Sequence, residues 1–423
     1  MASLRSEGTD MLNRHFFVWL HRWAGLAMAC FLVVVGLTGS LLAFRNEIDR
    51  LASPRFFAKP HPGVARLDFA TLTDRAEALV PQGQAYWIVA APDQITVAFI
   101  PRKNPATGKP YRLDLDWLYL NPWTGQELGR VKPGESGPSW LTIPILNLHA
   151  TLFLGGTGFW MLGIVALVWT LDCFVGFYLT LPASIGRFWQ RWTQAWQVKW
   201  RASAFRVNFD LHRASGLWLW PALFVLAVSS VMFNLPDVYH RLTDAILDYR
   251  PPPADGMSMS PTGEDLPPLI DFRTAISTAQ RLMAEQAASH GFSVERPVVF
   301  QYEYDHHAYF YNVKSSRDVW DRDHTSMTTL TFNADTGTLR SLNLPTGEHT
   351  GNTVFTWLVG LHQAWVFGLP YRIFLCVLGI VIAMLSYTGV YIWWRKRQGR
   401  ILAARKKQAS FAKAVAPLEG GTQ

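Results

Sequence analysis

The chain has 423 residues, of which 49% are hydrophobic and 14% aromatic, and it carries a formal net charge of +8. This apolar content, concentrated in a few windows, is too high for an ordinary soluble protein of this length. The three cysteines form neither a Cys-x-x-Cys-His motif nor a cluster, which excludes covalently attached c-type haem, iron–sulfur clusters and cysteine-bound zinc.

Four apolar windows of about 22 residues can each cross a hydrocarbon core about 30 Å thick. They cover residues 23–44, 159–181, 214–236 and 373–394, and Asp172 is the only formal charge inside them. Trp and Tyr gather at their ends, as at a membrane interface. The first window is too long for a signal peptide and lacks a cleavage site. The sequence predicts four transmembrane helices.

The positions of Lys and Arg predict the orientation of these spans. The connection 182–210 and the tail from residue 395 are strongly basic, so both belong in the cytoplasm together with both chain termini. Residues 45–158 and 237–372 are then exterior. The excess of basic over acidic residues is therefore explained by the membrane topology and by contact with anionic lipid in the bilayer. It does not indicate nucleic-acid binding.

The two exterior segments repeat one pattern. Asp68-Phe69 and Asp271-Phe272 each begin a stretch with helical periodicity. Alternating strand-like runs follow at 86–100 and 111–120, and again at 298–313 and 327–332, and each set ends in a turn with the pattern Asn-x-x-Thr-Gly. Each exterior segment is therefore predicted to be an α+β domain, a helix packed on a small antiparallel sheet.

Four histidines stand at the edges of the predicted spans. His21 and His212 open the first and third spans within the repeated motif Leu-His-Arg-x-x-Gly-Leu, and His149 and His362 precede the second and fourth spans. The topology places the first two on the cytoplasmic side and the other two on the outer side. Histidine pairs at one level on facing helices suit bis-imidazole haem. We therefore predict two haem b groups, one bound by His21 and His212 and one by His149 and His362.

Simpler interpretations of these residues exist. A single histidine at a helix start is usually an interfacial or capping residue, and internal duplication can copy a motif whose second version has no ligand role. Arg22 and Arg213 follow their histidines and can pair with haem propionates, or can simply anchor the helices at the membrane. Asp172 is predicted to be a proton relay or the partner of a buried donor, unless it is shallow and hydrated.

The chain resembles the PepSY-associated transmembrane family. The resemblance rests on the Leu-His-Arg-x-x-Gly motifs, on Gly36-Leu-Thr-Gly-Ser, on the ending Ser386-Tyr-Thr-Gly-Val-Tyr-Ile-Trp-Trp, and on the helix–strand–Thr-Gly units, which are similar to PepSY domains. It covers roughly residues 14–397. The fold expected is an α-helical membrane protein with four transmembrane helices in two repeats, plus two α+β PepSY-like periplasmic domains. The predicted segments are 1–44, 45–148, 149–181, 182–211, 212–236, 237–361, 362–394 and 395–423.

The resemblance also implies a function. Family members include bacterial inner-membrane, iron-regulated proteins and haem-containing reductases of ferric siderophores, so the expected electron acceptor is a ferric siderophore or another Fe(III) chelate. The electron donor would be a quinol or a cytoplasmic reductase, because the sequence has no dinucleotide-binding fingerprint with which to take hydride itself. Two alternatives remain open: a haem-free interaction protein that restrains a partner, and a permease that moves iron chelates without redox change.

Overall fold

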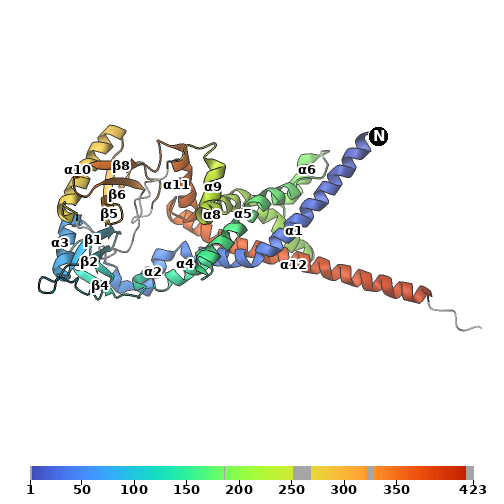
Figure 1. Cartoon of the computed structure of the whole chain (residues 1–423). Coiled ribbons are helices and arrows are strands. Elements are labelled where there is room, and N and C mark those ends of the chain that lie inside the picture. The colour runs from blue at the N-terminus through green and yellow to red at the C-terminus, as the bar shows by residue number, and fades with distance from the viewer. Residues whose placement is uncertain (1, 185, 251–267, 322–326, 416–423) are drawn as a thin grey trace, which may run out of the picture. The chain divides into compact units, whose positions relative to one another are not determined.

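A computed structural model describes residues 2–184, 186–250, 268–321 and 327–415, and Figure 1 shows its elements in chain order. The chain forms two compact units. The helical unit comprises Met1–Leu41, Asn147–Pro236 and Phe374–Gln423, and the sheet unit comprises Leu42–Leu146 and Asp237–Ile373. Each predicted half of the chain therefore contributes to both units.

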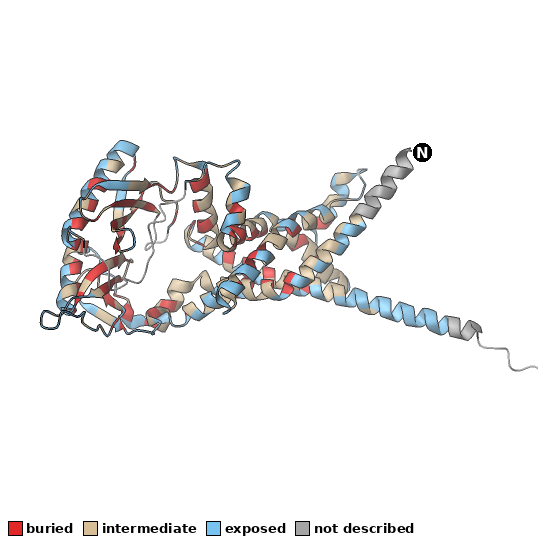
Figure 2. Ribbon diagram, viewed as in Figure 1, coloured by how far each residue is buried: buried red, intermediate tan, exposed pale blue. Residues whose placement is uncertain are grey.

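The helical unit is built mainly from five helices. They are α1 (Ala2–Leu42), α5 (Gly155–Thr180), α7 (Ala204–Trp218), α8 (Trp220–Asn234) and α12 (Gly368–Val415), with the short α6 (Phe188–Trp192) and η3 (Thr193–Trp196) between α5 and α7. Among the described residues, three stretches are long and apolar enough to cross a membrane: Arg14–Leu42, Gly155–Thr180 and Gly368–Ser410. They correspond to three of the four predicted spans. Figure 2 shows that the basic end of α12 is exposed.

The third predicted span differs from the other three because it is broken. Helices α7 and α8 together pass the same test of length and hydropathy, but they meet at an angle of 70°. Pro221 lies in the first turn of α8, a position that tolerates proline, whereas in one continuous helix it would lack a backbone N–H and its ring would clash with the carbonyl four residues earlier. At 15 residues each, the two helices are about 22 Å long, shorter than a hydrocarbon core. The helical unit therefore has three continuous candidate spans and one bent pair.

Small residues bring α1 and α12 into close contact. A Cβ atom on Gly36 would lie 2.6 Å from the Gly379 carbonyl oxygen, and one on Gly379 would overlap the carbonyl of Gly36. The Ser40 hydroxyl donates to the Cys376 carbonyl at 2.7 Å. Between membrane helices, such close approach supplies packing that lipid cannot, because lipid tails are as apolar as the side chains they would replace.

The sheet unit contains one antiparallel sheet of eight strands in the order β4-β3-β2-β1-β5-β6-β7-β8. The strands are β1 (Gly83–Ala90), β2 (Ile95–Pro101), β3 (Trp117–Leu120), β4 (Glu127–Val131), β5 (Val294–Glu303), β6 (Ala308–Ser315), β7 (Thr328–Asn333) and β8 (Leu339–Asn343). The helices of this unit are α2 (Arg45–Ala52), η1 (Pro54–Phe56), α3 (Phe69–Leu79), η2 (Gly137–Ser139), α4 (Thr142–Thr151, which ends in the helical unit), α9 (Pro236–Thr243), α10 (Phe272–His290) and α11 (Thr350–His362).

The two exterior domains predicted from the sequence are thus joined. Strand β1 of the first repeat pairs with β5 of the second, with Ile88 opposite Phe300. Side chains of α3, α10 and both sets of strands form one hydrophobic core. An unpaired edge strand exposes backbone hydrogen-bonding groups, and joining the two repeats satisfies one edge of each. Each repeat supplies four strands. A turn divides the predicted runs 86–100 and 298–313, and a strand not predicted from the sequence, β4 or β8, follows each Thr-Gly turn.

The predicted helix starts are confirmed. The Asp68 carboxylate accepts the backbone N–H of Thr71, and the Asp271 carboxylate accepts that of Thr274. These bonds satisfy N–H groups that the first helical turn leaves unpaired. They lower the pKa of both carboxyl groups, at Asp68 chiefly through the Thr71 N–H and at Asp271 chiefly through the Thr274 hydroxyl.

The close contact of α1 and α12 predicts the effect of one added methyl group. Gly379→Ala should lower the free energy of unfolding by about 1–3 kcal/mol, because the methyl group would overlap the α1 backbone. Gly399→Ala is the matched control in the same helix, since nothing lies within 4 Å of its Cβ position. Thermal unfolding of both variants in detergent measures the difference. Equal unfolding temperatures would contradict the packing described.

Candidate functional site

Three histidines of the helical unit each lie against a glycine of a neighbouring helix. A Cβ atom on each glycine would lie only 3.1–3.5 Å from the histidine Cε1 atom. The absence of a side chain at these glycines therefore lets the imidazole ring rest on the helix backbone. The three pairs are His21 of α1 with Gly176 of α5, His212 of α7 with Gly389 of α12, and His149 of α4 with Gly39 of α1.

His21 is oriented by a buried carboxylate. Its Nδ1 atom lies 2.9 Å from both carboxylate oxygens of Asp172. Asp172 precedes Gly176 by one turn of α5, and its side chain is only 9% exposed. An ionised carboxylate can only accept hydrogen bonds, so the proton of this contact lies on His21 Nδ1. Asp172 therefore accepts a hydrogen bond from His21, and its role as a proton relay or as the partner of a buried donor stays a prediction.

His212 is oriented by a threonine, which contacts its Nδ1 atom as Asp172 contacts that of His21. Its Nδ1 atom lies 3.0 Å from Thr388 Oγ1 and 3.1 Å from the Leu385 carbonyl oxygen. The Thr388 hydroxyl donates its proton to the Met384 carbonyl at 2.8 Å. The hydroxyl oxygen and the Leu385 carbonyl therefore both act as acceptors, and His212 Nδ1 carries the proton.

His149 repeats this arrangement on another helix pair. Its Nδ1 atom lies 3.0 Å from Thr38 Oγ1, and the Thr38 hydroxyl donates to the Val34 carbonyl at 2.7 Å. In both cases the threonine directly precedes the glycine on which the ring rests, in Thr38-Gly39 and Thr388-Gly389. A Thr-Gly pair inside an apolar helix thus binds one imidazole ring: the threonine accepts its N–H, and the glycine lets the ring contact the helix backbone.

The consequence is the same for all three rings. Acceptors hold Nδ1 in its protonated form, so Nε2 keeps its lone pair in the neutral imidazole. Neutral imidazole with one nitrogen hydrogen-bonded in this way is the usual form of a metal-ligating histidine, since the second contact fixes the tautomer and the ring plane. This geometry is compatible with metal ligation through Nε2, which stays a prediction.

His21 and His212 lie close enough to share one metal. Their ring centroids are 6.1 Å apart and their planes differ by 63°. Because metal–nitrogen bonds to imidazole are about 2 Å long, rings at this separation could both reach one metal ion. In the described part of the chain, no group of three or more His, Cys, Asp or Glu side chains could hold a metal ion. Haem needs only two protein ligands, because the porphyrin supplies the other four.

The fourth histidine lies in the other unit. His362 is the last residue of α11 in the sheet unit, whereas His149 belongs to the helical unit. Their pairing stays a prediction. Both histidines are followed, six residues later, by a glycine with positive φ at which the next helix begins: Gly155 at 54° and Gly368 at 62°. The duplicated local backbone agrees with the duplicated sequence.

The two predicted propionate partners have different environments. Arg213 donates through Nη2 to the buried Asp210 carboxylate at 2.9 Å and to the Gln194 carbonyl at 2.6 Å, whereas its buried Nε has no hydrogen-bond partner among the described residues. Arg22 is half-buried on α1. A role of either arginine toward a propionate stays a prediction.

Sequence reasoning missed the residues that orient the histidines. Thr38, Thr388 and the three glycines were not selected as site residues, and Asp172 was not connected to His21. A signal was present, because Thr-Gly occurs within both the first and the fourth apolar windows. What the sequence could not supply was which helix each ring faces.

Comparison with known proteins identifies the family of the chain. A family model described as the PepSY-associated TM region matches residues 18–396. The match includes all four histidines as well as Thr38, Asp172 and Thr388. The chain matches no curated protein.

The carboxylate beside His21 predicts a graded effect on stability. Asp172→Ala removes the acceptor of a buried N–H and should lower the free energy of unfolding by about 1–3 kcal/mol, whereas Asp172→Asn keeps an oxygen acceptor and should cost less. Thr170→Ala is a control in the same helix, because the Thr170 hydroxyl bonds only to the carbonyl of its own helix in the described structure. Thermal unfolding in detergent measures all three. An unfolding temperature for Asp172→Ala equal to that of the control would show that the contact does not stabilise the protein.

Proposed function

The chain belongs to the PepSY-associated transmembrane family, and from this premise we propose that it is a di-haem b-type electron-transfer protein of the bacterial inner membrane. Its proposed activity is the reduction of Fe(III) held by a siderophore in the periplasm. The observation that carries the proposal is the set of three imidazole rings whose Nδ1 atoms are bonded to Asp172, Thr388 and Thr38.

His21 and His212 would hold the inner haem. They come from α1 and α7, and the second contact of each ring comes from α5 or α12. Four helices therefore converge on one ligand pair, which fixes the ring positions before any group binds. A b-type haem bound there supplies reversible one-electron chemistry at iron.

His149 and His362 would hold the outer haem. His149 is already oriented by Thr38 at 3.0 Å, and the short connections from both histidines to their glycine turns are alike. With both termini in the cytoplasm, the second pair lies at the periplasmic side. Electrons would enter at the cytoplasmic side from a quinol or a reductase and leave toward the periplasm.

The two sites differ in the charge beside their ligands. The carboxylate of Asp172 draws the proton of His21 Nδ1 and makes the ring a stronger donor to the metal, whereas the neutral hydroxyl of Thr38 does this less for His149. A stronger donor stabilises ferric over ferrous iron, which lowers the reduction potential. The arrangement therefore favours electron movement from the inner to the outer site.

One electron is sufficient to release the metal from its chelate. Fe(III) would accept it and become Fe(II), and the iron–oxygen bonds of the chelate would break only afterwards, when the metal leaves. Hard oxygen donors bind Fe(III) much more tightly than Fe(II), so the reduced metal dissociates. Localisation, electron donor and acceptor are all parts of this proposal.

The proposal predicts a specific spectroscopic result. Protein made with ample haem should show a reduced-minus-oxidised spectrum of b-type haem, and His21→Ala should remove about half of it by deleting one ligand of one site. His290→Ala is the control, because His290 lies on the sheet unit and is paired with Glu348. A wild-type protein without a haem signal would contradict the proposal and favour a haem-free interaction protein or a permease.

The charge difference between the sites predicts a shift in potential. Asp172→Asn should raise the reduction potential of one haem by roughly 60 mV, a tenfold change in the equilibrium constant of a one-electron couple, and leave the other unchanged. Thr170→Val, in the same helix, should change neither. Potentiometric titration followed by absorbance measures both values. Unchanged potentials in Asp172→Asn would show that this carboxylate does not tune a haem.

A further inference from the structure

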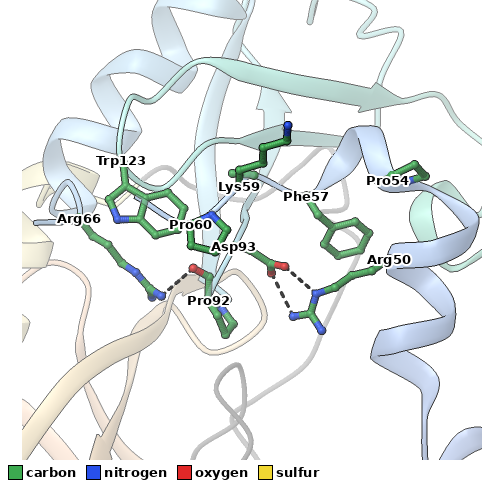
Figure 3. A pocket seen from close by; sticks show the side chains of 10 residues that line it. Arg50, Pro54, Phe57, Lys59, Pro60, Arg66, Pro92, Asp93 and Trp123 are labelled. Atoms are coloured by element: carbon green, nitrogen blue, oxygen red, sulfur yellow. Dashed lines mark hydrogen bonds and ion pairs between the residues drawn. The ribbon is translucent and has the colours of Figure 1, made fainter. Parts of the chain in front are cut away.

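The sheet unit contains a cavity of about 710 Å³ outside the histidine sites. It lies between the end of α2, the segment 57–66 and the two turns at 92–93 and 123 (Figure 3). Resting on the function proposed above, we propose that this cavity binds the substrate chelate, and that the chelate is anionic and has flat aromatic donor groups, as in a tricatecholate. A cavity of this volume is in the range of ordinary small-molecule sites.

The charge of the cavity is positive. Three cationic side chains and one carboxylate line it. The carboxylate, Asp93, is engaged by Arg50, whose Nε donates to it at 2.6 Å. Arg66 donates instead to the neutral Pro92 carbonyl at 2.6 Å, and Lys59 is exposed and makes no ion pair within the described ranges. Arg66 and Lys59 therefore present uncompensated charge to a ligand.

An aromatic surface stands beside these charges. The Arg66 guanidinium lies over the Trp123 ring, 5.5 Å from its centroid. The ring of His61 also contacts Trp123, with a distance of 5.2 Å between the two ring centroids. Planar ligand groups stack on both indole and guanidinium faces. The combination suits a ligand that is anionic and flat, and it suits a neutral aliphatic chelate much less well.

The walls of the cavity are held by backbone hydrogen bonds. The N–H of Ala58 donates to the Asp93 carbonyl at 2.8 Å, and the N–H of Leu67 donates to the Pro122 carbonyl at 3.0 Å. These bonds connect the segment 57–67 to both turns of the sheet. A site whose walls are already fixed loses less conformational entropy when a ligand binds.

The second repeat provides an internal comparison. Its turn has the same construction, since Asn333 Oδ1 accepts two backbone N–H groups as Asn121 Oδ1 does. The Ile270 N–H bonds to the Ala334 carbonyl, matching the bond from Leu67 to Pro122. The positions of Trp123 and Arg66 are therefore occupied by Asp335 and Leu269.

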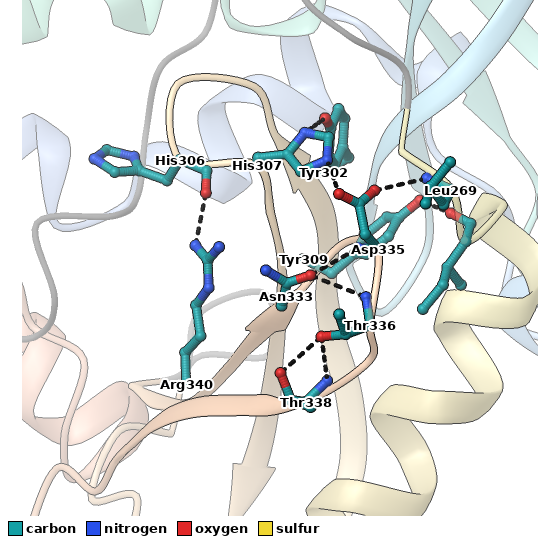
Figure 4. Close-up of polar contacts among 11 residues, drawn as sticks. Leu269, Tyr302, His306, His307, Tyr309, Asn333, Asp335, Thr336, Thr338 and Arg340 are labelled. Atoms are coloured by element: carbon teal, nitrogen blue, oxygen red, sulfur yellow. Dashed lines mark hydrogen bonds and ion pairs between the residues drawn. The ribbon is translucent and has the colours of Figure 1, made fainter.

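These replacements make the turn of the second repeat acidic, whereas that of the first repeat is cationic. Figure 4 shows Asp335 between His307 and the backbone N–H of Leu269, at 2.8 and 2.9 Å. The Leu269 N–H and then His307 hold the pKa of this carboxyl below its usual value, so it is ionised. A shared backbone thus carries an acidic turn in one repeat and a cationic, aromatic one in the other. The cavity residues are a specialisation of the first repeat and not a requirement of the fold.

Because the second repeat has the same turn with other residues, those residues can be placed in the turn of the first repeat. The double variant Arg66→Leu and Trp123→Asp places the second repeat's residues in the first and changes the charge of the cavity by two units. The control is Arg281→Leu, which removes an exposed arginine from α10 in the same unit. The probe is the gallium(III) complex of a tricatecholate, which has the charge and shape of the ferric complex but accepts no electron. Isothermal titration calorimetry on the purified full chain measures its binding.

The proposal expects that wild type and Arg281→Leu bind the probe alike and that the double variant binds at least about tenfold more weakly. Binding should weaken with added salt, and an uncharged gallium trihydroxamate should bind more weakly than the tricatecholate. Equal binding by wild type and the double variant, or a preference for the trihydroxamate, would overturn the proposal. Because the probe is redox-inert, binding without a haem signal would refute only the electron-transfer function, and a haem signal without binding would refute only this site.

Discussion

The site depends on one requirement, that the N–H of a neutral, half-buried imidazole between apolar helices must have an acceptor. A donor left without a partner there costs about 1–3 kcal/mol. Asp172, Thr388 and Thr38 meet this requirement for three histidines. Meeting it at Nδ1 leaves Nε2 with a lone pair, so the same contact that makes burial tolerable also prepares the ring for a metal.

The packing of the helices follows from the same requirement. A ring can reach an acceptor on the neighbouring helix only if the backbones lie close together, which explains the glycines at 39, 176 and 389. The contact of Gly36 with Gly379 and the hydroxyl bond of Ser40 belong to the same closely packed α1–α12 interface. The orientation of the histidine rings therefore depends on how closely the helices pack. A substitution that separates the helices should also disturb the rings.

Much of the architecture could be predicted from residue patterns, because it depends on local sequence. Hydropathy predicts the three continuous candidate spans, and Asp68 and Asp271 mark helix starts that hydrogen bonds confirm. Relations between distant segments could not be predicted. The pairing of β1 with β5 makes one sheet of two repeats, and nothing local in either strand specifies that partner. Likewise Asp172 and His21 are 151 residues apart, and only the packing of α1 on α5 reveals that they touch. The break at Leu219 could be predicted only in part: Pro221 predicts that the helix bends, but it does not predict the angle of 70°.

We propose above that the oriented histidines hold two haem groups. The most direct measurement is the ratio of haem b to polypeptide in protein purified from cells with ample haem, determined as the pyridine complex after extraction. The account predicts two haem b groups per chain, each low-spin with two imidazole ligands in the electron paramagnetic resonance spectrum of the oxidised protein. A ratio of zero, or iron with a non-histidine axial ligand, would contradict it.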